Sequence, residues 1–174
     1  RNTGDTQILS PEQINQCDTT SYGCSGGWSE SAYDYVSGAG GLATDDAYPY
    51  DDSTFNYGIT GTCSDSITPV VTITGYETVS SESAMATYME ATGPLSVCLD
   101  AATWNSYTSG VMSVCGNSVD HCVQAVGVDT SSYWKVRNSW GTDWGESGFI
   151  RLKYGSNTCD INNDPTYTTG AAAV

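Results

Sequence analysis

Residues 121–138 read HCVQAVGVDTSSYWKVRN, two apolar runs joined by a short polar stretch. Val, Tyr and Trp are enriched in strands, and the polar DTSS at 129–132 is typical of a turn. The stretch therefore predicts a β-hairpin. Further apolar runs of strand length lie at 95–99 and 148–154, so we expect the hairpin to be part of an antiparallel sheet.

The length of the predicted turn sets the register of this hairpin. A four-residue loop pairs Val128 with Tyr133, and it places His121 opposite Trp140. Asn138 is then a diagonal neighbour of His121, at about 7 to 8 Å between backbones, from which an amide oxygen can reach an imidazole N–H. The register alone thus brings His121 and Asn138 together.

His121 is the single histidine of the chain. A neutral amide fixes the orientation and tautomer of an imidazole and leaves its second nitrogen for a thiol or hydroxyl, which is half of a nucleophilic site. A His–Asn bond that only stiffens a sheet edge explains the same pattern. The hairpin by itself leaves both interpretations open.

The first third of the chain predicts helices. Ser10, followed by a proline and then by Gln13, is typical of a helix start with a capping box. Residues 28–37 have apolar side chains at helical spacing before a group of glycines. Strands are expected from about 70–79 onward, and one more helix is expected within 81–94.

These elements predict an α+β protein of two lobes. The composition becomes rich in Tyr, Gly and Thr before a boundary that we expect near residue 66. Residues 1–66 would form a helical lobe, and residues 67–174 would form a lobe dominated by an antiparallel sheet, with a tail that can cross back.

The chain is strongly acidic. Twenty Asp and Glu against five Lys and Arg give a net charge of -15, which repels phosphate backbones and anionic membrane surfaces. No run approaches the roughly 18 apolar residues of a membrane span. We therefore expect neither nucleic acid nor membrane as a partner.

Seven cysteines exceed what a cytosolic protein usually carries, and none has the CxxC spacing of a zinc site. We therefore expect disulfides, no metal and no cofactor. An odd number leaves at least one cysteine without a partner in the chain.

Three stretches together resemble the papain/cathepsin L-like cysteine proteases along essentially the whole chain. They are SPEQINQCDTTSYGCSGG at 10–27, VDHCVQAVG at 119–127 and VRNSWGTDWGESGFIRLKYG at 136–155. The resemblance implies a papain-like two-lobe fold, with a helical left lobe and an antiparallel, β-barrel-like right lobe. It also implies that the central helix of the left lobe is missing from this chain.

The resemblance assigns roles to four residues of the second and third stretches. His121 would be the catalytic base and acid, and Asn138 would orient it. Trp140 would shield their hydrogen bond from water, and Trp144 would line the leaving-group side.

The family's nucleophilic cysteine lies about 130 to 150 residues before the His and Asn, which places it about 10 to 30 residues upstream of Arg1. The family's oxyanion-hole glutamine lies further upstream. Cys122 cannot replace this nucleophile, because neighbouring residues of a strand point to opposite faces and Cys122 follows His121 directly.

The seven cysteines divide into two bridges that the resemblance implies, a third bridge that we predict, and one unpaired residue. These are, in order, Cys17–Cys63 and Cys115–Cys159, then Cys98–Cys122, then Cys24. In the family the position of Cys24 is bridged to a cysteine just before the nucleophile. Cys98 and Cys122 lie on neighbouring predicted strands, at positions where the family usually has small apolar residues.

The resemblance also implies a substrate site. Gly26 and Gly27 would hydrogen-bond the extended substrate backbone, because no side chain intervenes. The main specificity pocket, for the second residue before the scissile bond, would be lined by Trp28, Cys98, Asp120, Cys122 and Asp164. A carboxylate of Asp164 at the pocket floor favours a cation, so we expect Arg to be accepted there as well as apolar residues.

We therefore expect a cysteine endopeptidase that acts on peptides or proteins in a lysosomal, vacuolar or extracellular compartment. Its further partners would be the N-terminal segment that carries the nucleophile and a propeptide or protein inhibitor. A catalytically inactive homologue that binds or supports another protein is the alternative. An acidic extracellular lectin or adhesion module explains the composition but not the NSWGTDWGE run at 138–146.

Overall fold

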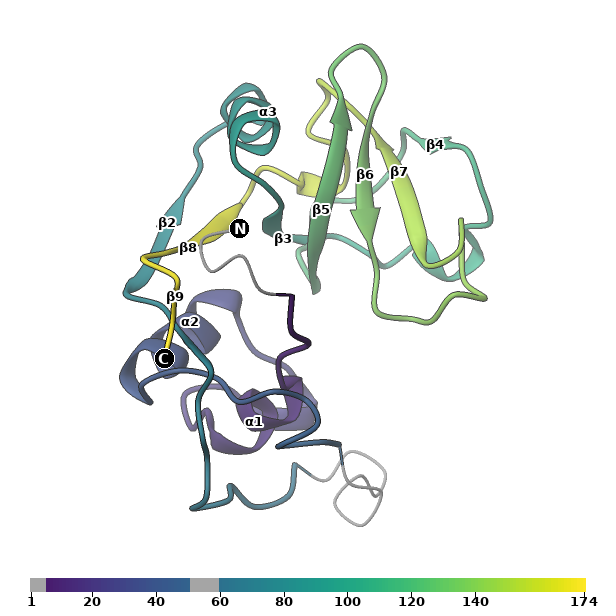
Figure 1. Cartoon of the computed structure of the whole chain (residues 1–174). Coiled ribbons are helices and arrows are strands. Elements are labelled where there is room, and N and C mark those ends of the chain that lie inside the picture. The colour runs from purple at the N-terminus through teal and green to yellow at the C-terminus, as the bar shows by residue number, and fades with distance from the viewer. Residues whose placement is uncertain (1–5, 51–59) are drawn as a thin grey trace. The chain divides into compact units, whose positions relative to one another are not determined.

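The computed structural model describes residues 6–50 and 60–174 of the chain (Figure 1). The chain divides into two compact units. The first consists of Arg1–Glu77 with Thr168–Val174, and the second consists of Thr78–Tyr167.

The boundary between the units lies after Glu77 and not near residue 66. The first strand, β1 (Val71–Thr72), pairs antiparallel with β9 (Ala172–Ala173) at the end of the chain. Strand pairing therefore keeps both the start of the strand-rich region and the C-terminal tail in the first unit. The change in composition precedes the boundary because β1 belongs to the helical unit.

Two α-helices and one short 3-10 helix form the described part of the first unit, together with the β1–β9 pair. The helices are α1 (Pro11–Cys17), η1 (Gly23–Ser25) and α2 (Ser29–Gly38). Ser10 caps α1, since its Oγ accepts a hydrogen bond of 3.0 Å from the backbone N–H of Gln13. Val36 is the buried residue of α2, as the helical spacing of apolar residues predicted.

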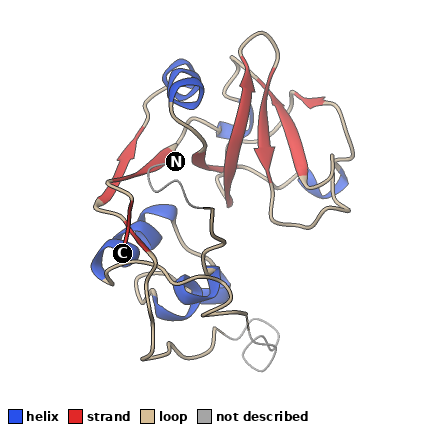
Figure 2. Cartoon of the chain, viewed as in Figure 1, coloured by secondary structure: helices blue, strands red, loops and turns tan. Residues whose placement is uncertain are grey.

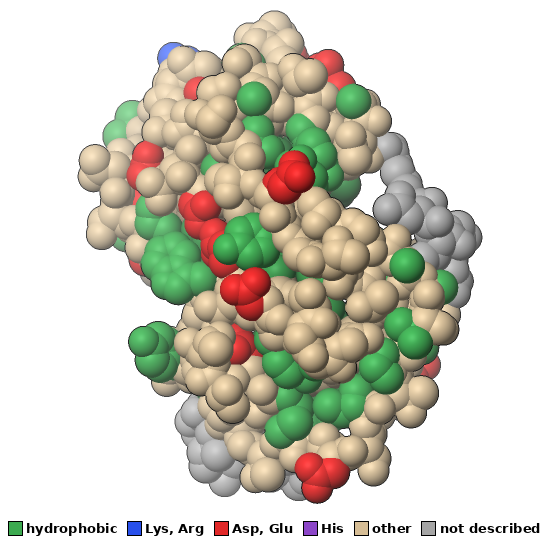
Figure 3. Space-filling view, turned by 90° about the vertical axis from the view of Figure 1, so that its left-hand side faces the viewer, with side chains coloured by type: hydrophobic (Ala, Val, Ile, Leu, Met, Phe, Trp, Pro, Cys, Tyr) green, Lys and Arg blue, Asp and Glu red, His purple; other side chains and the backbone are tan. Residues whose placement is uncertain are grey.

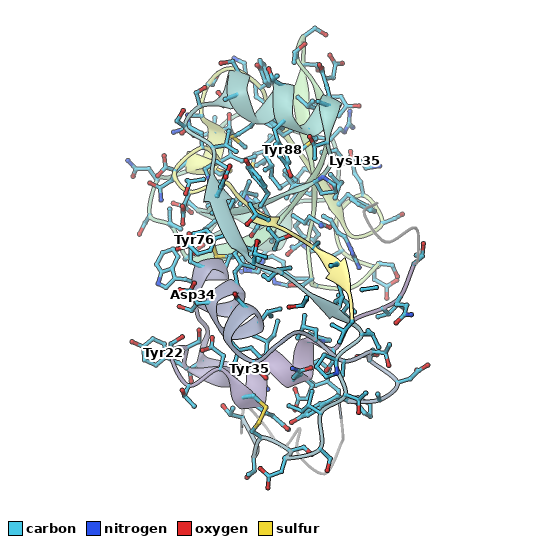
Figure 4. All side chains as sticks on the ribbon, turned by 60° about the vertical axis from the view of Figure 1, so that its left-hand side comes forward. Tyr22, Asp34, Tyr35, Tyr76, Tyr88 and Lys135 are labelled. Carbon is cyan, nitrogen blue, oxygen red and sulfur yellow. A yellow bond between two sulfur atoms is a disulfide. The ribbon has the colours of Figure 1, made fainter. Side chains whose placement is uncertain are left out.

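The predicted capping box at α1 is only half formed. The side chain of Gln13 does not return to the cap but is fully buried inside the first unit. Its amide donates to the hydroxyl of Tyr35 (labelled in Figure 4) and to the carbonyl of Gly41, and its oxygen accepts from the N–H of Ala43. Buried polar contacts thus outcompete the local cap.

The second unit is built on a sheet with a helix packed against it (Figure 2). Its elements are α3 (Glu82–Ala91), β3 (Leu95–Leu99), η2 (Trp104–Ser106), β4 (Val111–Met112), β5 (His121–Asp129), β6 (Tyr133–Arg137), β7 (Phe149–Lys153) and η3 (Thr158–Asp160). Two further strands, β2 (Gly75–Thr78) and β8 (Thr166–Thr169), run across the boundary between the units. The strands lie in the order β2-β8-β3-β5-β6-β7-β4, and the pairs from β8 to β4 are antiparallel except for β4 with β7.

Alternating apolar residues of the central strands and one face of α3 form the core of the second unit. The largest fully buried apolar side chains are those of Trp104, Trp134, Met85, Leu95, Leu99, Ile150, Leu152, Ile161, Val97 and Val136. Tyr88 of α3 (labelled in Figure 4) packs at the edge of this core, with its ring stacked on that of Tyr167 at 4.1 Å. No helix among residues 6–50 and 60–174 has the length and hydropathy needed to span a bilayer.

Strands β5 and β6 form the predicted hairpin, but the predicted turn is wrong by one position. Asp129 pairs with Tyr133, so the loop contains residues 130–132 and Val128 faces Trp134. The aspartate explains this shorter loop, because the Asp129 carboxylate accepts hydrogen bonds from the N–H and hydroxyl of Ser131 and so closes a tight turn.

A β-bulge between Ala125 and Gly127 corrects the register further along the hairpin. Beyond the bulge, Gln124 pairs with Arg137, which is the pairing that the longer loop would have given. One extra residue in β5 thus compensates for one residue fewer in the turn.

Acidic side chains are scattered over the visible surface in Figure 3, as expected for a chain with twenty acidic and five basic residues.

Candidate active site

The structure brings His121 and Asn138 together at one end of the hairpin. His121 is the first residue of β5, and Asn138 directly follows β6. The Nε2 of His121 lies 2.8 Å from the Oδ1 of Asn138. An amide oxygen can only accept, so Nε2 carries the proton and Nδ1 is left as the basic nitrogen. The backbone N–H of Asn138 donates to the carbonyl of Gly148 at 2.9 Å, which fixes the position of the amide.

Three tryptophans form a cluster that packs against the imidazole of His121. Trp140 stacks on the His121 ring at 5.2 Å between centroids, and Trp144 meets Trp140 edge to face at 5.3 Å. Trp104 lies behind them with its ring edge toward His121 at 6.2 Å, and its carbonyl accepts the indole N–H of Trp144 at 3.1 Å. Where such a cluster excludes water, the interaction between an imidazolium and a nearby anion is strengthened.

Trp104 is a site residue that the sequence analysis did not identify. It is fully buried and contacts His121, Trp140 and Trp144, so it joins the predicted residues into one cluster. The local sequence gives little warning of this, because a tryptophan in the segment after β3 is equally typical of an ordinary core residue.

A pocket opens beside the imidazole of His121. Its lining consists of Ala101, Ala102, Asn105, Asp120, His121 and Trp140. Of these, the residues of the segment 101–105 were not predicted. Asp120 holds that segment in place, because its Oδ1 accepts the N–H of Ala101 at 2.8 Å. The pocket can receive part of a ligand that reacts next to His121.

The structure contains three disulfides, Cys17–Cys63, Cys98–Cys122 and Cys115–Cys159, which are the three pairs expected from the sequence. Cys24 is unpaired and exposed. Every cysteine of the second unit is therefore in a disulfide, so Thr78–Tyr167 holds no free thiol that could react with His121.

The expected substrate-binding residues of the first unit are at its surface. Gly26, Gly27 and Trp28 are all exposed, with Trp28 at 51%. Gly26 has a φ of 104°, which favours glycine, whereas a Cβ on Gly27 would lie 2.5 Å from the Oγ of Ser21. The conformation and packing of the loop thus favour glycine at both positions, in addition to the predicted role in substrate binding.

The remaining pocket candidates lie in the second unit. Cys98 and Cys122 form a cross-strand pair between β3 and β5, and Asp120 immediately precedes His121. Asp164 is half-buried in the segment before β8, and β8 pairs with β3 through Thr166 and Ser96. Asp164 therefore lies just before β8, the strand that pairs with β3.

An ion pair supports the loop between β6 and β7, which carries Trp140 and Trp144. Glu146 follows Trp144 closely, and its carboxylate binds the guanidinium of Arg151 in β7 through two hydrogen bonds of 2.6 and 2.8 Å. It also accepts the N–H of Gly110 at 2.9 Å. The bonds from Arg151 lower the pKa of Glu146 from its ordinary value of 4.5 to about 2.

The described residues include no group of three or more His, Cys, Asp or Glu side chains that could hold a metal ion.

Residues 1–169 match the papain family of cysteine proteases. Cysteine proteinase B of Leishmania mexicana is 39% identical over 166 residues, which is 90% of this chain and 37% of that protein. Digestive cysteine proteinase 1 of Homarus americanus is 39% identical over 183 residues, which is 96% of this chain and 55% of that protein. The chain thus spans between about a third and a half of the length of these relatives.

Two solved structures share the fold. The bromelain protease of Ananas comosus, in complex with the E64 inhibitor, superposes with a TM-score of 0.83 and 36% identity, covering 95% of this chain and 80% of that one. A cysteine protease of Carica candamarcensis, in complex with E-64, gives 0.81 and 31%, covering 96% and 79%. With the hairpin, the His–Asn pair and the match over residues 1–169, these likenesses show that the chain belongs to the papain family of cysteine proteases and has its α+β fold.

Proposed function

We propose that this chain is the His–Asn part of a papain-like cysteine endopeptidase. The observation that supports this most is the 2.8 Å hydrogen bond between His121 and Asn138 under its aromatic cover. It leaves Nδ1 of His121 as a base held in one orientation. The nucleophile is a cysteine outside the second unit, whose own cysteines are all in disulfides, and we place it upstream of Arg1.

In the proposed reaction, Nδ1 of His121 takes the proton of the cysteine thiol, and the thiolate attacks the carbonyl carbon of the scissile peptide. The tetrahedral intermediate collapses when the imidazolium gives this proton to the leaving amine, which leaves an acyl-thioester. Water then attacks the thioester as His121 accepts its proton. Collapse of the second intermediate releases the carboxylic acid and regenerates the thiol.

Asn138 and the tryptophans serve this proton transfer. The Nε2–H bond to Asn138 keeps the imidazole in one orientation while Nδ1 gains and loses its proton. Trp140 and Trp144 keep water from competing for that bond, and exclusion of water also stabilises a thiolate–imidazolium pair.

The proposed substrate is a peptide or protein in an extended conformation. Gly26 and Gly27 would bind its backbone, and Trp28, Cys98, Asp120, Cys122 and Asp164 would line the pocket for the second residue before the scissile bond. A propeptide or protein inhibitor would bind the same surface. Three disulfides support a lysosomal, vacuolar or extracellular location, because such bonds persist in oxidising compartments.

The test is active-site labelling of the full-length protein that contains this chain. A thiol-directed epoxide is reacted with the wild type and with His121→Ala, and the labelled peptide is identified by mass spectrometry, while peptide hydrolysis is followed in parallel. We expect one labelled cysteine upstream of Arg1 and loss of both labelling and hydrolysis in His121→Ala. Exposed Asn163→Ala is the control and should behave as the wild type.

A full-length protein that carries no reactive cysteine and cleaves no peptide would contradict the proposal. It would indicate the alternative, a papain-fold homologue that acts by binding.

A further inference from the structure

The Cys98–Cys122 disulfide joins the two strands at the level of His121. Cys98 pairs with Cys122, and the next pair along β3 and β5 is Leu99 with His121. Successive residues of a strand point to opposite faces, so the disulfide lies on one face of the strand pair and the imidazole on the other. Any effect of the disulfide on His121 therefore passes through the backbone.

His121 lies at an end of β5 that is otherwise open. The described residues 113–120 before it have no helix or strand. In the described chain, the pairing of β5 with β6 begins only at Gln124 with Arg137, three residues after His121. Yet the hydrogen bond of His121 runs toward Asn138 on the β6 side. The position of the imidazole thus depends on how firmly β3 holds the first residues of β5.

Strand β3 is buried, and it is hydrogen-bonded to the start of β5. Its residues Leu95, Val97 and Leu99 are at most 1% exposed in the core of the second unit, and Cys98 is 1% exposed. Two hydrogen bonds join its end to the residue before His121: the N–H of Asp120 donates to the carbonyl of Leu99 at 3.0 Å, and Ala101 donates to the Asp120 carboxylate. The disulfide adds the one covalent link between these two strands.

We infer that the Cys98–Cys122 disulfide is a positioning element for His121. It ties the start of strand β5 to the buried strand β3 and so holds the imidazole at hydrogen-bond distance from Asn138. This inference rests on the proposed peptidase function, because positioning matters to a proton transfer at Nδ1. A merely stabilising disulfide would change the unfolding temperature without changing the state of the imidazole in the folded protein.

The test replaces the disulfide by apolar residues, as Cys98→Val/Cys122→Ala, in the full-length protein. The control is Cys17→Ala/Cys63→Ala, which removes the disulfide of the first unit. Histidine labelled with ¹⁵N reports the imidazole, and the signal of His121 is assigned with His121→Gln.

We expect the Nε2 proton of His121 to exchange with water about tenfold faster in the Cys98/Cys122 variant and to remain as in the wild type in the control. We also expect kcat to fall about tenfold, because small displacements of a catalytic group cost rate. Proton exchange at Nε2 is the deciding measurement, because both cysteines are also proposed to line the substrate pocket. Unchanged exchange and unchanged kcat in a folded variant would overturn the inference.

Two arrangements keep the test decisive. If the variant does not fold, mild reduction of the wild type, with the opened disulfide located by alkylation and mass spectrometry, gives the same comparison. If the wild type cleaves no peptide, the proposed function fails, but proton exchange at His121 still shows whether the disulfide holds the imidazole.

Discussion

At the scale of single residues, the hydrogen bond between His121 and Asn138 is the feature on which the proposed chemistry depends. It joins a side chain that would become charged in the proposed reaction to an amide residue that is only 8% exposed. Hydrogen bonds to charged groups contribute about 1.5 to 3 kcal/mol, more than neutral ones. Trp140, which we propose to shield this bond, stacks on the imidazole while remaining 39% exposed itself, so it can also face a substrate.

Replacement of Asn138 by Ala in the full-length enzyme should lower kcat about 10- to 100-fold, since each 1.4 kcal/mol corresponds to a factor of ten. The imidazole would lose its acceptor at Nε2 and its fixed orientation. Steady-state hydrolysis of a peptide substrate measures the effect, with Asn163→Ala as the matched control. An unchanged kcat for Asn138→Ala would contradict the orienting role.

Asp164→Ala tests the proposed specificity pocket. We expect it to lower kcat/KM for substrates with Arg at the second position before the scissile bond, while substrates with an apolar residue there are cleaved as before. Glu90→Ala, which removes an exposed carboxylate from α3, controls for the change in net charge. Equal Arg preference in Asp164→Ala and the wild type would place Asp164 outside the pocket.

At the scale of elements, the hairpin shows what the sequence could predict and what it could not. The apolar runs and the polar turn between them predicted both strands. The register predicted the approach of His121 to Asn138, because a strand pair has a fixed spacing. It did not predict the three-residue turn or the bulge before Gly127, since hydrogen bonding by Asp129 decides the turn and a bulge leaves no regular pattern. The two errors cancel before His121 is reached.

The loop between β6 and β7 depends on Glu146, which yields a prediction about pH. The pKa of Glu146 is lowered from 4.5 to about 2 by its bonds with Arg151, so this carboxylate stabilises the fold fully above pH 4.5 and progressively less as the pH falls toward 2. Glu146→Gln should therefore unfold at a lower denaturant concentration at pH 7, and its deficit relative to the wild type should shrink toward pH 2.

Urea unfolding at pH 7, 5 and 2.5 measures this difference. Glu90→Gln, at an exposed site, should follow the wild type at each pH. A deficit of Glu146→Gln that stays constant over the whole range would show that charge on Glu146 is not what stabilises the loop.

At the scale of the whole molecule, the resemblance predicted the papain-like fold and two of the three disulfides, and the predicted neighbouring strands gave the third, Cys98–Cys122. The extent of the two units was not predicted. The tail returns to pair with β1, a contact between residues about 100 positions apart that no local pattern reveals. Trp104 was missed for a related reason, since only the folded chain brings it against His121 and Trp144.

The Cys17–Cys63 disulfide should determine much of the stability of the first unit. It closes a loop with a sequence separation of 46, for which chain entropy gives a stabilisation of about 4 kcal/mol. We expect Cys17→Ala/Cys63→Ala to lower the free energy of unfolding by up to this amount, measured by denaturant unfolding. A loss below about 1 kcal/mol would mean that the buried contacts of α1 hold the loop without the disulfide.

The two units also differ in the kinds of side chain that they bury. The interior of the described first unit includes Ser10, Glu12 and Gln13, whereas that of the second is dominated by apolar strands. Apolar surface raises the heat capacity when it meets water and polar surface lowers it, so the first unit should have the smaller heat-capacity increment of unfolding per residue. Its stability then varies less with temperature, and cooling should weaken it less than the apolar core around Trp134.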